Sequence, residues 1–397
     1  MNDLAGSFKT LGKYQEAKQL QQYVLEQRIT VLGPDHPDTL KIMADLSDLD
    51  RNLGRFAEAK QLQQKILEKQ TAILGPHHPD TLLTMSSLAS SYEELGMSVE
   101  AKQLYQKVVM QRTATLGPGH PHTLLAMGNL ANVYSALGLY TEATELEQKV
   151  LKERTALFGP YNQRTLLSMS NLANTYQNLG KYAEAEQLEQ KVLEWLTAIL
   201  GPDHLLTLSS MGNLACHYSA LGRHAEAAQL HKEVVERRTA ILGPDHSLTL
   251  VAMGNLANSY SVLHRYAEAE IMQQKVLEQH TTILGPDHPD TLWSMANLAS
   301  YYNHLGKHLD AVQLNQKVLE RQTAILGTDH PDTLITMRNL AGSYAHLHRH
   351  SDAEKLQQKV LEQQTAVLGA DHPQLLITMG QLAKSCSALG RYTEAER

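Results

Sequence analysis

A repeat of constant length constrains this chain more than any other feature of its sequence. The dipeptide Leu11-Gly12 returns every 42 residues as far as Leu389-Gly390, and a histidine replaces its glycine only after Leu263 and Leu347. No insertion or deletion disturbs this spacing. Because self-similarity at a period of about 20 to 50 residues is the signature of small units stacked in a row, we expect a solenoid.

The same spacing predicts the domain organisation. Residues 1–10 read as the end of a partial repeat, residues 11–388 as nine 42-residue periods, and residues 389–397 as the start of another partial repeat. No linker or low-complexity segment interrupts the series. We therefore expect residues 1–397 to form a single solenoid domain. Because neither end carries a recognisable capping unit, we also expect the chain to be part of a longer protein.

Each period is expected to fold into two helices. In the fourth period, apolar residues recur at helical spacing over residues 166–179 and again over residues 182–200. Gly180 follows the first stretch and Gly201-Pro202 follows the second, and residues of these types commonly end helices. The sequence therefore predicts an all-α fold built from antiparallel helical hairpins.

The loop that joins one hairpin to the next is the most closely repeated segment. The sequence "LGPDHPDTL" occurs unchanged at residues 32–40 and 284–292. Its Asp-His pair could be an acid–base or metal-binding pair, or it could cap a helix. Copies in neighbouring repeats should lie about 10 Å apart, too far to share one ion. One repeat has Tyr161-Asn162 instead without a change in spacing, so we interpret the segment as a structural joint.

Composition narrows the choice of partners and of location. The chain has 35 basic and 42 acidic residues and a net charge of −7, which gives no reason to expect a nucleic acid or an anionic membrane as partner. No apolar run approaches the ~20 residues that span a membrane. The two cysteines lie far apart in the sequence, which favours a reducing, cytoplasmic location.

The sequence offers no grouping of residues that is typical of an enzyme. The motifs H-E-x-x-H, C-x-x-C and G-x-S-x-G are missing, and nearly every polar residue has a counterpart 42 residues away. Histidines gather between His304 and His350, but His308 and His350 stand where other repeats have a tyrosine that packs. We predict that the protein is not an enzyme and has no cofactor and no dedicated metal site.

The repeat resembles a known family. Its recurring residues, written for the fourth period, are Met169, Asn171, Leu172, Ala173, Tyr176, Leu179, Gly180, Tyr182 and Ala185. This pattern resembles the tetratricopeptide repeat, with methionine where tryptophan is usual and with 42 residues where about 34 are common. The long form with "LGPDHP" at its joint is similar to the kinesin light chain repeat.

The resemblance implies a right-handed superhelix whose concave wall, built from the first helix of each hairpin, binds a protein or a peptide. Such arrays also form the sensor end of fungal and bacterial NLR-type signalling ATPases, so we expect the ligand-sensing region of a larger receptor. No G-x-x-x-x-G-K-[ST] phosphate loop is present, so the nucleotide-binding domain would lie upstream, outside this chain. A kinesin-light-chain-like cargo adaptor and a self-associating structural array remain alternatives.

Asparagines recur at the sixth motif position, which the resemblance places on the concave wall; they are Asn129, Asn171, Asn213, Asn255, Asn297 and Asn339. An amide both donates and accepts hydrogen bonds, so a row of them could hold the backbone of an extended peptide. Alternatively, each asparagine bonds within its own repeat and only orders it. Asn132, Asn174 and Asn258, at the ninth position, belong to the same predicted groove.

Four residues differ from their equivalents in the other repeats. Trp293 is larger than the Leu, Val and Ile found at its position, and it would anchor an apolar ligand side chain if that position is exposed. Arg338, together with Lys384, makes the C-terminal part of the predicted groove mildly basic. Trp195 and Leu196 replace polar residues, which suggests a second interface with another chain or an upstream domain.

Overall fold

The computed structural model describes residues 2–10, 13–368 and 373–391, and these residues form helices and no strands. The first helices of the hairpins are α1 (Asn2–Thr10), α3 (Pro37–Asn52), α5 (Pro79–Glu94), α7 (Pro121–Ala136), α9 (Gln163–Asn178), α11 (Leu205–Ala220), α13 (Ser247–Val262), α15 (Pro289–His304), α17 (Pro331–His346) and α19 (Pro373–Ala388). The second helices are α2 (Tyr14–Leu32), α4 (Phe56–Leu74), α6 (Ser98–Leu116), α8 (Tyr140–Phe158), α10 (Tyr182–Leu200), α12 (His224–Leu242), α14 (Tyr266–Leu284), α16 (His308–Leu326) and α18 (His350–Leu368). The prediction of an all-α array of hairpins is confirmed.

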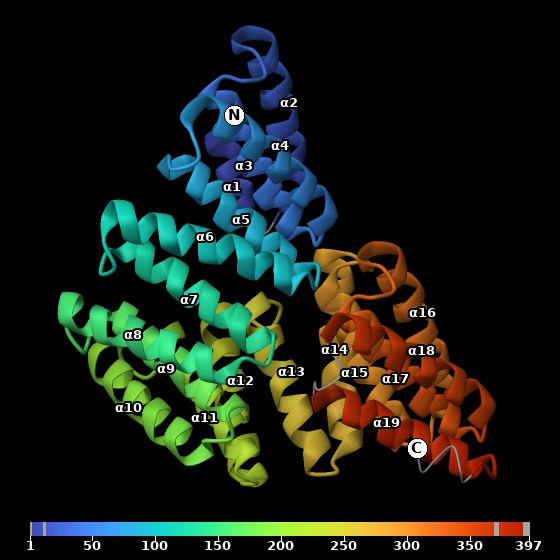
Figure 1. The fold of residues 1–397 in the computed structure, drawn as a ribbon. Helices are drawn as coiled ribbons and strands as arrows, with labels where there is room; N and C mark the ends of the chain where they lie inside the picture. The colour runs from blue at the N-terminus through green and yellow to red at the C-terminus, as the bar shows by residue number, and fades with distance from the viewer. Residues whose placement is uncertain (1, 11–12, 369–372, 392–397) are drawn as a thin grey trace. The chain divides into compact units, whose positions relative to one another are not determined.

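The helices fall into two compact units, residues 1–157 and residues 158–397. Within each unit, consecutive helices pack side by side, as α4 and α5 do in the first and α11 and α12 do in the second (Figure 1). In the second unit the first helices also contact one another, α9 with α11, α11 with α13, α15 with α17 and α17 with α19. These contacts join α9, α11 and α13 into one row and α15, α17 and α19 into another. The prediction that residues 1–397 make one solenoid domain stays a prediction.

The core of each unit is built from three consecutive helices at a time. In the first unit Leu82 and Met85 of α5 pack with Val108 of α6 and with a residue of α7, Ala126. In the second unit Leu208, Met211, Val234 and Ala252 form the equivalent cluster from α11, α12 and α13. Because each cluster joins a hairpin to the next one, stability resides in contacts between neighbouring repeats.

One residue in the left-handed backbone conformation explains the constant geometry of the hairpin turn. Gly180 and Gly222 have φ values of +80° and +79° at the turn, where a residue without a Cβ is favoured. His264 and His348, which replace this glycine, adopt the same conformation with φ of +58° and +59°. The replacement therefore leaves the turn geometry, and with it the register of the array, unchanged.

The joint between hairpins acts as a helix cap. At its first copy, His36 Nδ1 accepts a hydrogen bond from the backbone N–H of Asp38 at 3.2 Å. Where the histidine is replaced, the side chain of Asn162 accepts from Arg164 N at 3.0 Å in the same way. The aspartate of the joint has another partner, since Asp203 Oδ1 lies 2.9 Å from Arg237 Nη1 on the next second helix. The joint thus caps one helix and ties it to another.

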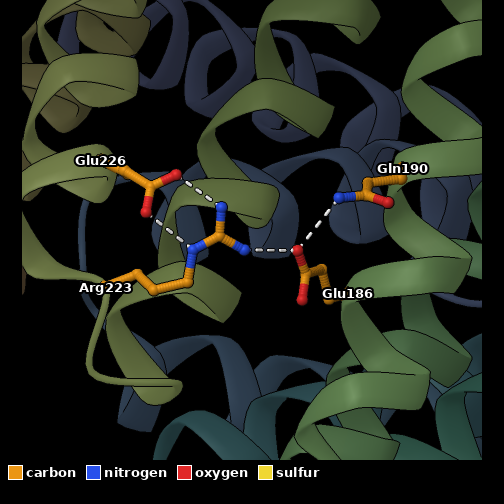
Figure 2. A network of polar contacts seen from close by, with 4 residues as sticks. All are labelled: Glu186, Gln190, Arg223 and Glu226. Atoms are coloured by element: carbon orange, nitrogen blue, oxygen red, sulfur yellow. Dashed lines mark hydrogen bonds and ion pairs between the residues drawn. The ribbon is translucent and has the colours of Figure 1, made fainter.

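An ion-pair network holds neighbouring hairpins together at the opposite end of the second helices (Figure 2). Arg223, which precedes α12, donates from Nη1 to Glu186 Oε1 of α10 at 2.7 Å and from Nε to Glu226 Oε1 at 2.8 Å. Gln190 also donates to Glu186, at 3.0 Å, and the guanidinium lies 4.0 Å from the ring centroid of Tyr218. Since these residues have their hydrogen-bonding partners within the array, we assign the network a structural role.

Candidate functional site

Asparagines occupy one equivalent position on five first helices of the second unit, α9, α11, α13, α15 and α17. All of their side chains are partly exposed, and they are Asn171, Asn213, Asn255, Asn297 and Asn339. We call the exposed side of these helices that carries the five asparagines, Trp293 and Arg338 the ladder face. The sequence prediction placed these residues in one binding row. In the structure they lie on the consecutive first helices α9 to α17, and their role in binding stays a prediction.

Most of these amides are not used inside the array. The side chains of Asn171, Asn255 and Asn339 are partly exposed and have no hydrogen bond within the described part of the chain. Asn297 Nδ2 is buried, and it also lacks a partner among the described residues. Because an amide hydrogen bond is favourable only when it is made, the partly exposed amides of Asn171, Asn255 and Asn339 are available to a ligand, whereas the buried Asn297 Nδ2 is not.

Asn213 differs, because its side chain interacts with a buried carboxylate. The carboxylate of Glu189 on α10 is fully buried and accepts from Ser170 Oγ at 3.1 Å and from Ser210 Oγ at 2.7 Å. Burial raises the pKa of Glu189, and hydrogen bonds from Ser210, Ser170 and Asn213 oppose this shift. At this position the asparagine orders its own part of the array, which is the alternative considered from the sequence.

The asparagines predicted at the ninth motif position differ in whether their side chains have a hydrogen-bond partner inside the array. Asn174 is exposed, whereas Asn258 Oδ1 accepts a hydrogen bond from Tyr301 Oη of the next first helix at 2.6 Å. Asn129 and Asn132 lie on α7 of the first unit, where the former is partly exposed and the latter exposed. These two residues therefore belong to a different compact unit from the ladder face.

Apolar side chains accompany the amides. Trp293 is 47% exposed, and the ring lies against α13, where a Cβ added to Gly254 would be 3.5 Å from it. Leu167 and Val251, at the same position of α9 and α13, are 56% and 51% exposed. The stripe is therefore surface rather than core, which the sequence alone left open. An indole that rests on a glycine and keeps half its area exposed suits an apolar anchor point.

Arg338 stands at a position that other repeats give to small residues. It is partly buried on α17, and desolvation lowers the pKa of its guanidinium. The equivalent residues of α11 and α13 are Gly212 and Gly254. A positive charge has therefore been introduced into an otherwise neutral part of the ladder face.

The predicted second interface needs a correction at Leu196. This side chain is only 5% exposed, so the expectation that it contacts another chain is wrong. The polar residues at the equivalent positions are buried as well, and they include Arg112, Arg238, His280 and Gln322. Those polar groups bond inside the array, as Arg238 does to the carbonyl of Leu248 at 2.8 Å. Leucine simply fills this slot with an apolar group.

Trp195 has a partner within its own unit. Its ring meets Tyr161 edge to face, with 5.0 Å between ring centroids. Other repeats place an ion pair at these two positions, as between Asp287 Oδ1 and Arg321 Nη1 at 3.0 Å. The aromatic pair therefore replaces an ion pair that ties a joint to the next second helix. A second interface at Trp195 stays a prediction.

Sequence reasoning missed a column of buried polar residues on the second helices. The residues equivalent to Glu189 are also buried, among them Gln63, Tyr105, Glu147, His231, Gln273 and Asn315. Burial raises the pKa of Glu147 to about 7, and neither carboxylate oxygen has a hydrogen-bond partner in the described residues. The signal was present in the sequence as a polar residue recurring every 42 residues within an otherwise apolar helix face.

Two surface hollows lie away from the ladder face. Hollows of 510 Å³ and 480 Å³ lie on the second helices α2 and α10, lined by residues of those helices and not by ladder-face residues. In the described ranges, no helix has the length and apolar character needed to cross a membrane. The same residues contain no group of three His, Cys, Asp or Glu side chains placed to hold a metal ion.

A family model described as "Tetratricopeptide repeat" matches the chain repeatedly, over residues 1–68, 48–109, 99–156, 163–240, 221–272, 248–324, 295–362 and 336–397. No curated protein matches the chain. Kinesin light chain-type, nearly identical TPR-like repeats from Podosopora anserina are 29% identical, with a TM-score of 0.47 over 52% of this chain and 97% of that one.

Two solved structures share the fold at lower identity. A Pyrococcus horikoshii signal transduction ATPase with numerous domains and a tetratricopeptide repeat sensor is 16% identical, with a TM-score of 0.50 over 85% of this chain and 50% of that one. Rap protein complexed with Competence and Sporulation Factor is 11% identical, with a TM-score of 0.58 over 92% of this chain and 97% of that one. The chain spans about half the length of the ATPase.

Proposed function

We propose that this chain, which belongs to the tetratricopeptide repeat family, binds an extended polypeptide along the ladder face of residues 158–397 without catalysing a reaction. One observation carries the proposal: a row of partly exposed amides without internal partners runs beside exposed apolar side chains. Amides bind a peptide backbone with little dependence on its sequence, and apolar anchors supply affinity. The ladder face thus suits a polymer better than a small enclosed ligand.

We further propose that the bound polypeptide is a signal sensed for a larger receptor. A tetratricopeptide repeat is described as the sensor in the Pyrococcus horikoshii ATPase, and the Rap structure is described as a complex with a named factor. Both support a sensing role by analogy of fold. A cargo adaptor similar to a kinesin light chain is the alternative, and it would use the same ladder face. The identity of the bound protein distinguishes the two roles.

The chain contains only two tryptophans, so fluorescence can test the proposal. Peptides are first selected by display against the whole protein. In Trp195→Phe, Trp293 is the sole tryptophan, and we expect a selected peptide to shift its emission and to protect it from acrylamide. In the matched variant Trp293→Phe, the remaining Trp195 should not respond. A response confined to Trp195 would overturn the proposal, because the peptide would then bind outside the ladder face.

A further inference from the structure

Two pairs of aromatic rings stack between neighbouring helices of the second unit. Tyr266, the first residue of α14, stacks on His304 at the end of α15, with ring centroids 4.4 Å apart and 3° between the ring planes. His308, the first residue of α16, stacks in the same way on His346 at the end of α17, at 4.9 Å and 4°. The two pairs stand at equivalent positions of successive repeats, so a histidine in the second pair replaces the tyrosine of the first.

The second stack joins helices that position part of the ladder face. Trp293 lies on α15 and Asn339 on α17, and these two helices contact each other. Helix α16 packs against both of them. The stack of His308 on His346 ties α16 to α17 at one end of that contact. A ligand that touches both α15 and α17 therefore depends on the packing that this stack supports.

Acid affects a stack of two histidines more than a stack of tyrosine on histidine. Imidazole changes its charge between about pH 5 and pH 8, whereas phenol stays neutral there, so only the second pair can carry two positive charges. Like charges on rings 4.9 Å apart repel each other. In addition, Nδ1 of His308 is buried and has no partner in the described residues, so the N–H of a protonated ring would lack an acceptor. Desolvation lowers the pKa of His346, and His308 and His304 lower it further.

The acidic side chains at this end of the neighbouring helices already interact with other cations. Among the described residues, these interactions are Glu270 and Asp310 with Lys307, Asp352 with Arg349, and Glu354 with Arg391. The other titratable or charged side chains at the same helix ends are basic or imidazole groups, namely His304, His348, His350, Lys355 and Lys384. A second positive charge on the stack therefore adds to a region whose carboxylates are engaged elsewhere.

We propose that the stack of His308 on His346 makes binding on the ladder face sensitive to pH, because acid charges both rings, loosens α17 from α16 and weakens the hold on the polypeptide. This inference rests on the proposed function, since it concerns regulation of the same face. The intact stack is the neutral form, so affinity is full above the ordinary histidine pKa of 6.5 and falls as the pH drops below it. By linkage, a bound polypeptide makes the two rings harder to protonate.

The test measures the affinity of the whole protein for display-selected peptides without histidine, at about pH 7.5 and about pH 5.5, on either side of the ordinary histidine pKa. For the parent we expect affinity about fivefold weaker at the lower pH, from the repulsion between the charged rings. His308→Tyr recreates the pairing of Tyr266 with His304 and should remove most of this loss. The converse variant Tyr266→His creates a second pair of stacked histidines and should make the loss larger.

A second measurement needs no peptide. Protection of α16 and α17 against hydrogen exchange, corrected for the intrinsic effect of pH, should fall at the lower pH in the parent and stay higher in His308→Tyr. Tyrosine stands at this position in Tyr182 and Tyr266, so the variant should fold normally. The same loss of affinity in the parent, His308→Tyr and Tyr266→His would overturn the inference, and the proposed function would stand if binding still depends on Asn171 and Asn255. Binding that depends on neither asparagine would overturn both.

Discussion

Helices α3 and α5 of the first unit expose different chemistry from the first helices of the second unit, whereas α7, with Asn129 and Asn132, resembles the second unit. In the first unit, α3 carries Asp45 and Asp48 and α5 carries Glu93 on their partly exposed faces. These charges interact within the unit, since Lys9 Nζ lies 4.0 Å from Asp48 Oδ2 and Arg51 lowers the pKa of Glu93 against the larger effect of burial. On α9 to α17 of the second unit, the equivalent positions carry uncharged residues, and the side chains of Asn171, Asn255 and Asn339 have no hydrogen bond among the described residues.

The difference shows how one repeat can serve two purposes. The backbone and the core clusters are alike in both units, so stability does not require either surface. Charged side chains that already form ion pairs within their own unit contribute little attraction for a partner. The amides and the guanidinium of the ladder face that lack internal partners keep their capacity to form hydrogen bonds with a ligand. The comparison therefore supports the proposal that residues 158–397 hold the ligand.

The largest expected effect concerns the buried ion pair of the first unit. Lys18 Nζ and Asp50 Oδ1 are in direct contact, and both residues are buried. Lys18→Ala should lower the free energy of unfolding around α2 and α3 by about 3–5 kcal/mol, because it leaves a buried carboxylate unpaired. Hydrogen exchange of these helices, followed by mass spectrometry, measures the loss.

A second substitution serves as the control for that result. Tyrosine stands at the positions equivalent to Asp50 in other repeats, as at Tyr92 and Tyr134. Adding Asp50→Tyr to Lys18→Ala should therefore recover most of the protection. Arg321→Ala in the second unit, which breaks an exposed pair with Asp287, should change little. Equal losses for Lys18→Ala and Arg321→Ala would remove the distinction between the two kinds of pair.

The next effect depends on pH and compares two buried acids at equivalent positions, one in each unit. The folded-state pKa of Glu147 is about 7, above its ordinary value of 4.5, so the fold binds this proton more tightly than the unfolded chain does. Stability from this group is therefore highest below pH 4.5 and declines as the pH rises towards 7. Glu147→Gln should abolish this decline and add on the order of 3 kcal/mol at pH 8.

Urea unfolding at a series of pH values checks this prediction. Glutamine is the residue at the equivalent Gln63 and Gln273, so the variant should fold normally. The matched variant Glu189→Gln should gain less stability in this way, because Ser170 and Ser210 donate to this carboxylate and reduce the rise of its pKa. Parallel pH curves for the parent and Glu147→Gln would mean that Glu147 is not the group that titrates.

A smaller effect separates two asparagines of the ladder face. Asn213→Ala removes a polar interaction with the buried Glu189 and should lower the free energy of unfolding by about 1–2 kcal/mol. Asn171→Ala removes no internal bond and should leave stability within about 0.5 kcal/mol of the parent. Thermal melting followed by circular dichroism measures both. If the two variants melt alike, internal bonding does not distinguish the two positions.

The sequence predicted the fold because the determinants of the hairpin are local. Apolar spacing, glycine at the turns and a capping residue at each joint act over a few residues, and they recur without change of register. For the same reason the helix predicted over residues 182–200 matches α10, Tyr182–Leu200. Tyr161 and Trp195 were harder to interpret, since their contact replaces an ion pair that spans two repeats.

The candidate site was predictable in position but not in bonding. The five asparagines could be aligned from the repeat, yet only the structure shows that Asn213 bonds to Glu189, because that contact depends on a residue of another helix. The prediction that Leu196 is exposed was wrong, because the polar residues at the equivalent positions of other repeats suggested an exposed face. Those residues are buried, and the arginines among them bond to backbone carbonyls, as Arg112 does to His122, which composition cannot show.

The most direct test of the account combines Asn171→Ala and Asn255→Ala, two asparagines whose amides have no partner in the described ranges. Calorimetric titration with a display-selected peptide should show affinity reduced about tenfold or more, from roughly 1 kcal/mol for each lost amide. The melting temperature should stay at the parent value, as should the affinity of the surface control Gln187→Ala. Unchanged affinity in the folded double variant would contradict the claim that the ladder face holds the polypeptide.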